Sequence, residues 1–343
     1  MSNSRSRSTV ANTNPNKDPG ASSRTARLQT FEWCPSVEMC CDGPVRPSER
    51  TLPDFSADSL DPAQLREVAV AVAERAAEHV RLRRPEVFGL VGSGAAEGGS
   101  VAAKSTPTDP VTVVDTETEQ VIRDLLAQLR PADSILGEEG GGDTDDSAGV
   151  RWVVDPIDGT VNFLYGIPAF AISVAVQIDG FSVAGAVVDV SLETTYAAHR
   201  GGGATMTTAD GVVSDLQANE VTELSMALLA TGFGYGADRR KVQGTLIGQI
   251  LPQVRDIRRI GSAALDLCMV ATGRVDAHFE HGLSPWDWAA GSLIASEAGA
   301  VINVPAPNST SADGDVVYAV APAIAEQFAH MLGATGADQP IPS

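Results

Sequence analysis

A buried strand that ends in two closely spaced aspartates is the sequence feature that most constrains this chain. The segment reads Trp152-Val153-Val154-Asp155-Pro156-Ile157-Asp158-Gly159-Thr160. Its apolar residues predict a buried strand, Pro156 stops the strand ladder, and residues 161–165 have the character of a helix. Asp155 and Asp158 therefore converge at a strand end beside a helix start. Carboxylates and backbone carbonyls are the ligands that Mg²⁺ prefers, and the N–H groups of Gly159 and Thr160 at a helix start favour an anion such as phosphate.

A hairpin turn at Asp158-Gly159 is the plain alternative, because this dipeptide is a strong hairpin signal. The whole run from Asp155 to Thr160 is far more specific than the dipeptide alone. We therefore favour the interpretation as a metal and anion site.

Other acidic positions are ambiguous when each is taken alone. Glu138 and Glu139 follow a short strand signal, but the glycines and aspartates after them also fit a solvated loop. Asp115 can cap the helix that follows it, and Asp287 completes a capping-box pattern that begins at Ser284. A shared site would be needed to give these residues a functional meaning.

The composition disfavours several classes of protein. With 343 residues, about two domains are expected. The 24 basic and 44 acidic residues give a net charge of −20, which disfavours binding to nucleic acid or anionic lipid. Apolar stretches fall short of the roughly 18 residues that a membrane span needs, and the first residues lack a secretory signal pattern. The four cysteines match no disulfide or zinc framework, so we expect a cytoplasmic protein.

The chain is predicted to consist of four segments. We expect a disordered leader over residues 1–58, an N-terminal α+β half over 59–200, a C-terminal alternating α/β half over 201–336 and a tail over 337–343. In the first half, helices are predicted from residue 61 and over 116–130, the second with a Thr116/Glu119 capping box. The predicted strands of this half are 134–137, 151–155, 170–178 and 182–190, the last two joined by an Asp179-Gly180 turn. The second half is predicted to have strands at 227–231, 255–260, 275–280, 300–304 and 316–320, and helices at 238–251, 262–272, 284–298 and after Pro322.

Taken together, the motifs resemble the inositol monophosphatase family, the Mg²⁺-dependent, lithium-sensitive phosphatases related to fructose-1,6-bisphosphatase. The resemblance covers roughly residues 65–332. The residues that carry it, in the family's order and spacing, are Lys104-Ser105, Asp109-Pro110-Val111-Thr112, Asp115, Gly137-Glu138-Glu139, the run from Asp155 to Phe163, Gly261-Ser262-Ala263-Ala264, Trp286-Asp287 and Gly299. Trp288 and the pair Gly299-Ala300 depart from the common pattern. The resemblance implies an α/β (α+β) fold, a layered α/β/α/β/α sandwich of the inositol monophosphatase and sugar phosphatase type, with the active site where the two halves meet.

The resemblance also implies two or three Mg²⁺ ions and a set of site residues. Glu138, Asp155 and the Ile157 carbonyl would hold one ion, Asp155, Asp158 and Asp287 would hold a second, and a third would rest on Glu138. Thr160 and Asp115 would position and deprotonate the attacking water, and Lys104 would add a compensating positive charge. The Gly159 and Thr160 amides would bind phosphate. The residues implied around the rest of the substrate are Asp158, Gly261, Ser262, Ala263, Glu280 and Asp287.

The implied activity is Mg²⁺-dependent hydrolysis of a small phosphate monoester by an activated water molecule. Such esters hydrolyse very slowly because their charge repels hydroxide, so neutralisation by metal ions suits the chemistry. The leading substrate is myo-inositol-1-phosphate, because Glu280 and the turn 261–263 match the alcohol-binding positions. Histidinol phosphate, fructose-1,6-bisphosphate and 3′-phosphoadenosine-5′-phosphate are alternatives, and a non-catalytic regulatory protein of the same fold is a further one that the intact acidic set argues against. A homodimer is expected by resemblance, with no nucleic-acid or membrane partner.

Three further features carry weaker predictions. His278 and His281 flank Glu280, but their spacing favours structural or rim roles over a shared metal ion. The glycine-rich run 232–236 lacks the spacing of a nucleotide-binding loop and predicts a mobile loop near the site. A basic cluster predicts a charged strand edge or interface, with contact to a second phosphate as the alternative; it consists of Arg255, Arg258 and Arg259.

Overall fold

The structure is a computed structural model that describes residues 59–89, 101–104, 108–142 and 149–343. The chain divides into the units Met1–Thr51 and Leu52–Ser343, and all of the described residues lie in the second unit. The leader predicted over 1–58, with its three cysteines, and Ser105 lie outside the described residues. Among the described residues, no helix combines the length and apolar character that crossing a membrane requires.

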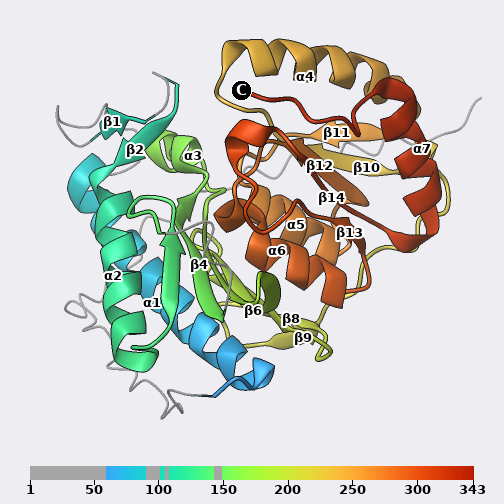
Figure 1. Ribbon diagram of the computed structural model, residues 1–343. Coiled ribbons are helices and arrows are strands. Elements are labelled where there is room, and N and C mark those ends of the chain that lie inside the picture. Colours follow the sequence, from blue (N-terminus) through green and yellow to red (C-terminus); the bar gives the residue numbers. More distant parts are fainter. Residues whose placement is uncertain (1–58, 90–100, 105–107, 143–148) are drawn as a thin grey trace, which may run out of the picture. The chain divides into compact units, whose positions relative to one another are not determined.

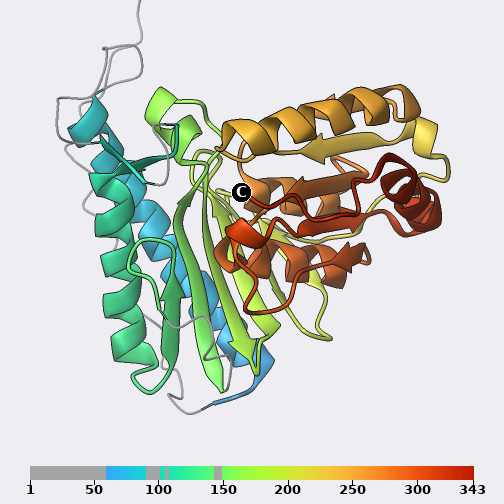
Figure 2. The same ribbon diagram turned by 45° about the horizontal axis from the view of Figure 1, so that its top comes forward.

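The elements stack in five layers, helices, sheet, helices, sheet and helices (Figures 1 and 2). Helices α1 (Pro62–Phe88) and α2 (Val113–Leu129) cover the outer face of a seven-stranded sheet. Helices α5 (Ala263–Ala271) and α6 (Pro285–Glu297) lie between this sheet and a five-stranded one. Helices α4 (Ala237–Ile250) and α7 (Ala325–Thr335) pack on the far face of the second sheet. The α/β/α/β/α sandwich predicted from the sequence is confirmed.

The first sheet has the order β3-β4-β5-β6-β7-β8-β9. Its strands are parallel between β3 and β4 and antiparallel elsewhere. Asp179 and Gly180 have positive φ angles of 50° and 81°, as a two-residue type I′ turn requires, so the predicted hairpin is confirmed. The strands of this sheet are β3 (Ser134–Gly137), β4 (Val150–Asp158), β5 (Ala171–Ile178), β6 (Phe181–Asp189), β7 (Thr194–His199), β8 (Ala204–Thr207) and β9 (Val213–Asp215).

The second sheet has the order β11-β10-β12-β14-β13. Strand β10 is parallel to β11 and β12, whereas β14 is antiparallel to β12 and β13. The carboxyl ends of β10 and β12 therefore share one edge of the sheet. These strands are β10 (Leu228–Thr231), β11 (Asp256–Arg258), β12 (Ala277–His281), β13 (Val301–Asn303) and β14 (Val316–Val320).

The remaining elements are short. A two-stranded ribbon pairs β1 (Val101–Ala103) with β2 (Pro110–Thr112), and the six-residue helix α3 (Thr160–Tyr165) follows β4. The 3₁₀ turns are η1 (Leu224–Met226), η2 (Leu251–Gln253), η3 (Ser311–Asp313) and η4 (Pro322–Ile324).

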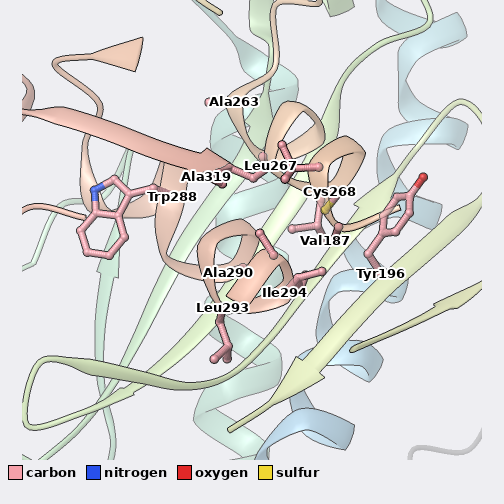
Figure 3. Close-up of a cluster of buried hydrophobic side chains, with 14 of the residues drawn as sticks. Val187, Tyr196, Ala263, Leu267, Cys268, Trp288, Ala290, Leu293, Ile294 and Ala319 are labelled. Atoms are coloured by element: carbon pink, nitrogen blue, oxygen red, sulfur yellow. The ribbon is translucent and has the colours of Figure 1, made fainter. Parts of the chain in front are cut away.

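The core between the two sheets is built on small residues of α5 and α6. A Cβ added to Gly291 of α6 would lie 2.8 Å from the Cβ of Leu267 in α5, so glycine allows the two helices to approach closely. Figure 3 shows side chains of both helices between Val187 of the first sheet and Ala319 of the second. Because both sheets bury these helices, their N-terminal ends are held in fixed places, and these ends carry candidate site residues.

The first turn of α2 corrects one prediction. The capping box is formed by Thr112 and Asp115, because Asp115 Oδ2 accepts a 3.0 Å hydrogen bond from the Thr112 N–H. The predicted Thr116/Glu119 box is therefore wrong. The Glu119 carboxylate instead accepts hydrogen bonds from the N–H groups of Glu139 and Gly140, at 2.7 and 2.8 Å, and so shapes the turn after β3.

Candidate active site

The carboxyl end of β4 carries the first two acidic residues of the site. Between Asp155 and Asp158 the pairing with β5 shifts by one residue, which gives a bulge where Pro156 interrupts the ladder. Both side chains are buried. Asp155 Oδ1 accepts a 2.9 Å hydrogen bond from the Ile157 N–H, and Asp158 Oδ2 accepts a 2.7 Å bond from the Ala264 N–H at the start of α5. The bulge thus directs the carboxylates of Asp155 and Asp158 toward the same region.

Asp287 joins them from the first turn of α6. It completes a capping box with Ser284, whose N–H donates to Asp287 Oδ2 at 2.7 Å. Asp155, Asp158 and Asp287 each offer a carboxylate oxygen, and these three oxygens lie within 4.8 Å of one another. Asp287 is therefore both a helix cap and a member of the acidic cluster.

Glu138 enters the cluster from the end of β3. Its N–H donates to the Val154 carbonyl at 3.2 Å, because β3 and β4 run in parallel, and its side chain shares a hydrogen bond with Asp155. Lys104 Nζ lies 2.7 Å from Glu138 Oε1 and 2.5 Å from Glu139 Oε1. Lys104 thus places a positive charge beside the cluster, as the sequence analysis expects.

A second polar pair lies next to the cluster. Thr160 Oγ1, at the start of α3, lies 3.1 Å from Asp115 Oδ1 and 3.0 Å from the Ile157 carbonyl oxygen. Asp115 is fully buried, and burial raises its pKa to about 6. The pair connects the first turn of α2 to the turn that follows β4.

The electrostatics of the cluster suit a divalent cation. Burial raises the pKa of Asp155 and of Asp287 well above the ordinary value, and mutual repulsion among the carboxylates adds to this effect. Burial also raises the pKa of Asp158 to about 6, against hydrogen bonds from Ser262 and Ala264 that lower it. Oxygen donors alone, crowded and desolvated, match the requirements of Mg²⁺ rather than those of a softer metal. The arrangement therefore fits the metal that the sequence predicts.

Gly159 lies between the metal-facing turn and the second half of the chain. Its φ is 92°, and an added Cβ would lie 3.0 Å from the Ala169 carbonyl and 3.1 Å from the Gly261 carbonyl, so both conformation and space require glycine. The neighbouring Asn162 donates to the carbonyls of Ala169 and Ile260, at 2.7 and 2.9 Å. These contacts bring the predicted substrate turn 261–263 next to α3.

Glu280 lies at the carboxyl end of β12. A Cβ on Gly232, just after β10, would lie 2.0 Å from Glu280 Oε2, so the carboxylate lies directly against the backbone of that residue. Burial raises the pKa of Glu280 to about 7, Arg259 acts in the opposite sense, and repulsion from Asp158 adds to the rise. The structure thus brings Glu280 within electrostatic reach of the acidic cluster.

The histidines and Arg258 occupy other places, whereas Arg259 lies near the site and acts electrostatically on Asp158 and Glu280. His281 Nε2 lies 2.9 Å from the Ala337 carbonyl, and His278 is fully buried 3.8 Å from Asp266, so both lie within packed structure. Arg258 belongs to the edge strand β11 and pairs with Asp256 at 2.7 Å, as a charged strand edge requires, while contact of Arg259 with a second phosphate stays a prediction. Two residues beside the site had no role assigned from the sequence, Tyr235 and Asp266, and each interacts electrostatically with Asp158. Tyr235 lies in the glycine-rich run 232–236 that predicts a loop near the site, whereas no motif indicates Asp266.

Comparison with known proteins agrees with this geometry. The model of the inositol monophosphatase family matches residues 61–335. The chain belongs to this family. Members of the inositol monophosphatase family are in general Mg²⁺-dependent, and this chain is an enzyme of the phosphoric monoester hydrolase class.

Curated relatives within the family are similar over most of their length. The chain is 59% identical over 270 residues to the inositol-1-monophosphatase of Mycobacterium leprae (strain TN), which covers 78% of this chain and 92% of the relative. It is 55% identical over 286 residues to the inositol-1-monophosphatase SuhB of Mycobacterium tuberculosis (strain ATCC 25618 / H37Rv), covering 82% and 98%. The solved structure of Mycobacterium tuberculosis SuhB matches with a TM-score of 0.67 at 49% identity, over 81% of this chain and 98% of that one.

Proposed function

We propose that this inositol monophosphatase family member hydrolyses myo-inositol-1-phosphate to inositol and phosphate in a reaction that depends on Mg²⁺. The observation that carries the proposal is the convergence of Asp155, Asp158 and Asp287 from β4 and α6 on one buried place. Glu138 adds a fourth carboxylate through its hydrogen bond to Asp155. The names of the mycobacterial relatives support inositol-1-phosphate as the substrate.

The proposed metal ligands are those that the family resemblance implies, and the contacts around the β4 bulge support them. Glu138, Asp155 and the Ile157 carbonyl would hold one Mg²⁺, and Asp155, Asp158 and Asp287 would hold a second; a third would rest on Glu138. When bound, the ions would neutralise the phosphate charge and would lower the pKa of a water molecule, so that it can lose a proton and attack the phosphorus. The protein orients these ligands through the Ile157 and Ala264 N–H groups and through the Ser284 cap.

Thr160 and Asp115 are proposed to place the attacking water and take its proton. Asp115 Oδ2 is occupied by Thr112, which leaves Oδ1, beside the Thr160 hydroxyl, as the oxygen that can accept a proton. With a pKa of about 6, this carboxylate is mostly ionised near neutral pH and still basic enough to act. The Gly159 and Thr160 amides would contact the phosphate, and Lys104 would balance the charge of Glu138.

Glu280 and the start of α5 are proposed to bind the alcohol. The residues 261–263 lie beside Asp158 through the hydrogen bond from Ser262 Oγ to its carboxylate. A carboxylate at position 280 can accept hydrogen bonds from substrate hydroxyls. This favours a polyhydroxylated alcohol over the alternatives histidinol phosphate and 3′-phosphoadenosine-5′-phosphate, whereas the remaining alternative, fructose-1,6-bisphosphate, also carries free hydroxyls and is separated only by comparing rates.

Phosphate release from these four esters, with Mg²⁺ and with a chelator, tests the proposal. We expect inositol-1-phosphate to give the highest kcat/KM and the chelator to abolish turnover. Glu280→Gln should lower kcat/KM for inositol-1-phosphate by about tenfold, since hydrogen bonds to a charged group are lost. The exposed Glu326→Gln on α7 is the matched control and should behave as wild type. Preference for another ester, or equal rates with the chelator, would refute the proposal.

The proposed partner is a second copy of the chain. The net charge of −20 opposes nucleic-acid binding, and family membership favours a homodimer. Light scattering after size exclusion would test this, and a mass of one chain, 35.6 kDa, would contradict it.

A further inference from the structure

The loop between β10 and α4 lies at the edge where the carboxyl ends of β10 and β12 meet. It spans residues 232–236 and reads Gly-Phe-Gly-Tyr-Gly. Because β10 and β12 are parallel, their carboxyl ends lie at the same edge of the sheet. The loop follows β10 at this edge, and Glu280 lies near the carboxyl end of β12. Ligands of open α/β sheets are commonly bound outside the carboxyl ends of strands. The proposed reaction leaves the only tyrosine of this loop without a role.

The loop is held at its first and its middle residue. Its first residue, Gly232, contacts the Glu280 carboxylate so closely that a Cβ would lie 2.0 Å from Oε2. The Gly234 N–H donates to Gln243 Oε1 at 3.1 Å, and a Cβ there would lie 2.8 Å from Cδ of the buried Arg239. Arg239 Nε in turn donates to the Ile341 carbonyl at 2.8 Å, near the C-terminus marked beside α4 in Figure 1. The loop therefore holds Tyr235 in a defined place.

Tyr235 connects the loop after β10 to the two-stranded ribbon of β1 and β2. Thr108 Oγ1 donates to the Tyr235 carbonyl at 3.1 Å, across 127 residues of sequence, and Thr108 lies just before β2. The Tyr235 residue is 38% exposed. Its phenol lies within electrostatic reach of four carboxylates, which together with burial raise its pKa; they belong to Asp109, Asp158, Asp287 and Glu138.

The hydrogen-bonding groups around Glu280 indicate what the Tyr235 phenol can contribute to substrate binding. Ionised carboxylates only accept hydrogen bonds, whereas each hydroxyl of a polyol both donates and accepts. Glu280 can satisfy a substrate hydroxyl as an acceptor, and Arg259, which acts electrostatically on Glu280, is a charged donor. The phenol hydroxyl adds a neutral donor, because a tyrosine phenol, with an ordinary pKa of about 10, is protonated at working pH.

We propose that Tyr235 is a substrate-contact residue that donates a hydrogen bond to a hydroxyl of the alcohol part and thereby selects phosphate esters of polyols. This inference rests on the proposed function, because it assumes that the acidic cluster binds a phosphate ester. The Thr108 contact and the Glu280–Gly232 packing act as its positioning contacts.

Tyr235→Phe tests the inference, since it removes one hydroxyl and keeps the ring. KM for inositol-1-phosphate should rise about fivefold, the usual effect of losing one neutral hydrogen bond, with kcat little changed. KM for para-nitrophenyl phosphate, which has no alcohol hydroxyl to bind, should stay within about twofold of wild type. Tyr165→Phe is the matched control, because Tyr165 is 75% exposed at the end of α3 and should leave both substrates unaffected.

The possible results separate the inference from the function beneath it. Equal KM changes for both esters, or no change for either, would overturn the role of Tyr235 while leaving the phosphatase assignment intact. Mg²⁺ affinity measured by calorimetry should match wild type, and a parallel loss in Tyr235→Phe would also overturn a substrate contact. Absence of Mg²⁺-dependent turnover in the wild-type chain would instead refute the proposed function.

Discussion

Thr160 Oγ1 lies 3.1 Å from Asp115 Oδ1, although 45 residues separate them along the chain. The same hydroxyl lies 3.0 Å from the Ile157 carbonyl, so two acceptors compete for one proton. When the Ile157 carbonyl binds another partner, the Thr160 hydroxyl can donate its proton only to Asp115. The pair therefore couples the turn after β4 to the first turn of α2.

Asp115→Asn should separate the catalytic role of this residue from its role in the helix cap. An asparagine side-chain oxygen can still accept the hydrogen bond of the Thr112 N–H, so the unfolding temperature should change little. A neutral amide cannot take a proton, so kcat should fall by about 100-fold or more. Steady-state kinetics and thermal unfolding check both statements, with the exposed Asp124→Asn on the same helix as control. Turnover within a few-fold of wild type would exclude Asp115 as the base.

Ser262→Ala should weaken both α5 and the acidic cluster. Ser262 Oγ accepts the Leu265 N–H at 3.2 Å as the N-cap of α5 and donates to Asp158 Oδ2. The free energy of unfolding should fall by about 1–2 kcal/mol, the usual effect of losing an N-cap. Mg²⁺ affinity should fall as well, because Asp158 loses a partner that orients it. Ser262→Thr keeps the hydroxyl and should restore both values in chemical denaturation and calorimetry; equal losses in both variants would argue against the hydroxyl.

The stabilisation by Mg²⁺ should depend on pH. Burial raises the pKa values of Asp115 and Asp158 from 3.8 to about 6 in the metal-free protein, so the folded state binds more protons than the unfolded one within this window. Each such group stabilises the fold below its unfolded pKa, and this stability is lost as pH rises through the folded pKa. Because Mg²⁺ needs ionised ligands, the gain in Tm from saturating Mg²⁺ should be larger at about pH 7.5 than at about pH 5. Thermal scans with and without Mg²⁺ check this, and an equal or larger gain at the lower pH would contradict it.

Local patterns explain which parts of the fold could be predicted. The Asp179-Gly180 hairpin and the strand that ends at Asp155 depend on neighbouring residues, so the sequence indicates them directly. Strand β7 was not predicted, because it is buried on nearly every residue and lacks the alternation of a half-exposed strand, and β8 and β9 were not predicted, because their four and three residues are too few to show a pattern. The Thr116/Glu119 capping box was predicted wrongly for a different reason, a tertiary contact of Glu119. Glu119 is used by the turn after β3, a contact that lies about 20 residues away and leaves no local signal.

The residues of the candidate site also divide into those that local sequence indicates and those that only the fold brings together. Asp155 and Asp158 are close in sequence, and their chemistry could be inferred from the strand, proline and turn. The convergence of Asp287 with them is a tertiary contact between α6 and β4, which a single sequence indicates only through family resemblance. Tyr235 is indicated only as part of the glycine-rich run 232–236, because its exact position depends on the Thr108 contact and on the packing of α4.

Calorimetric titration of Mg²⁺ into the Asp155→Asn variant, combined with phosphate release, is the most direct test of the account. Asp155 contacts Glu138 and lies in the group with Asp158 and Asp287, so loss of its charge should weaken Mg²⁺ binding by at least about tenfold and abolish turnover in a folded protein. The surface variant Asp124→Asn should bind Mg²⁺ and release phosphate as wild type does. Wild-type Mg²⁺ affinity and turnover in Asp155→Asn would contradict the claim that this acidic cluster is the metal centre of the enzyme.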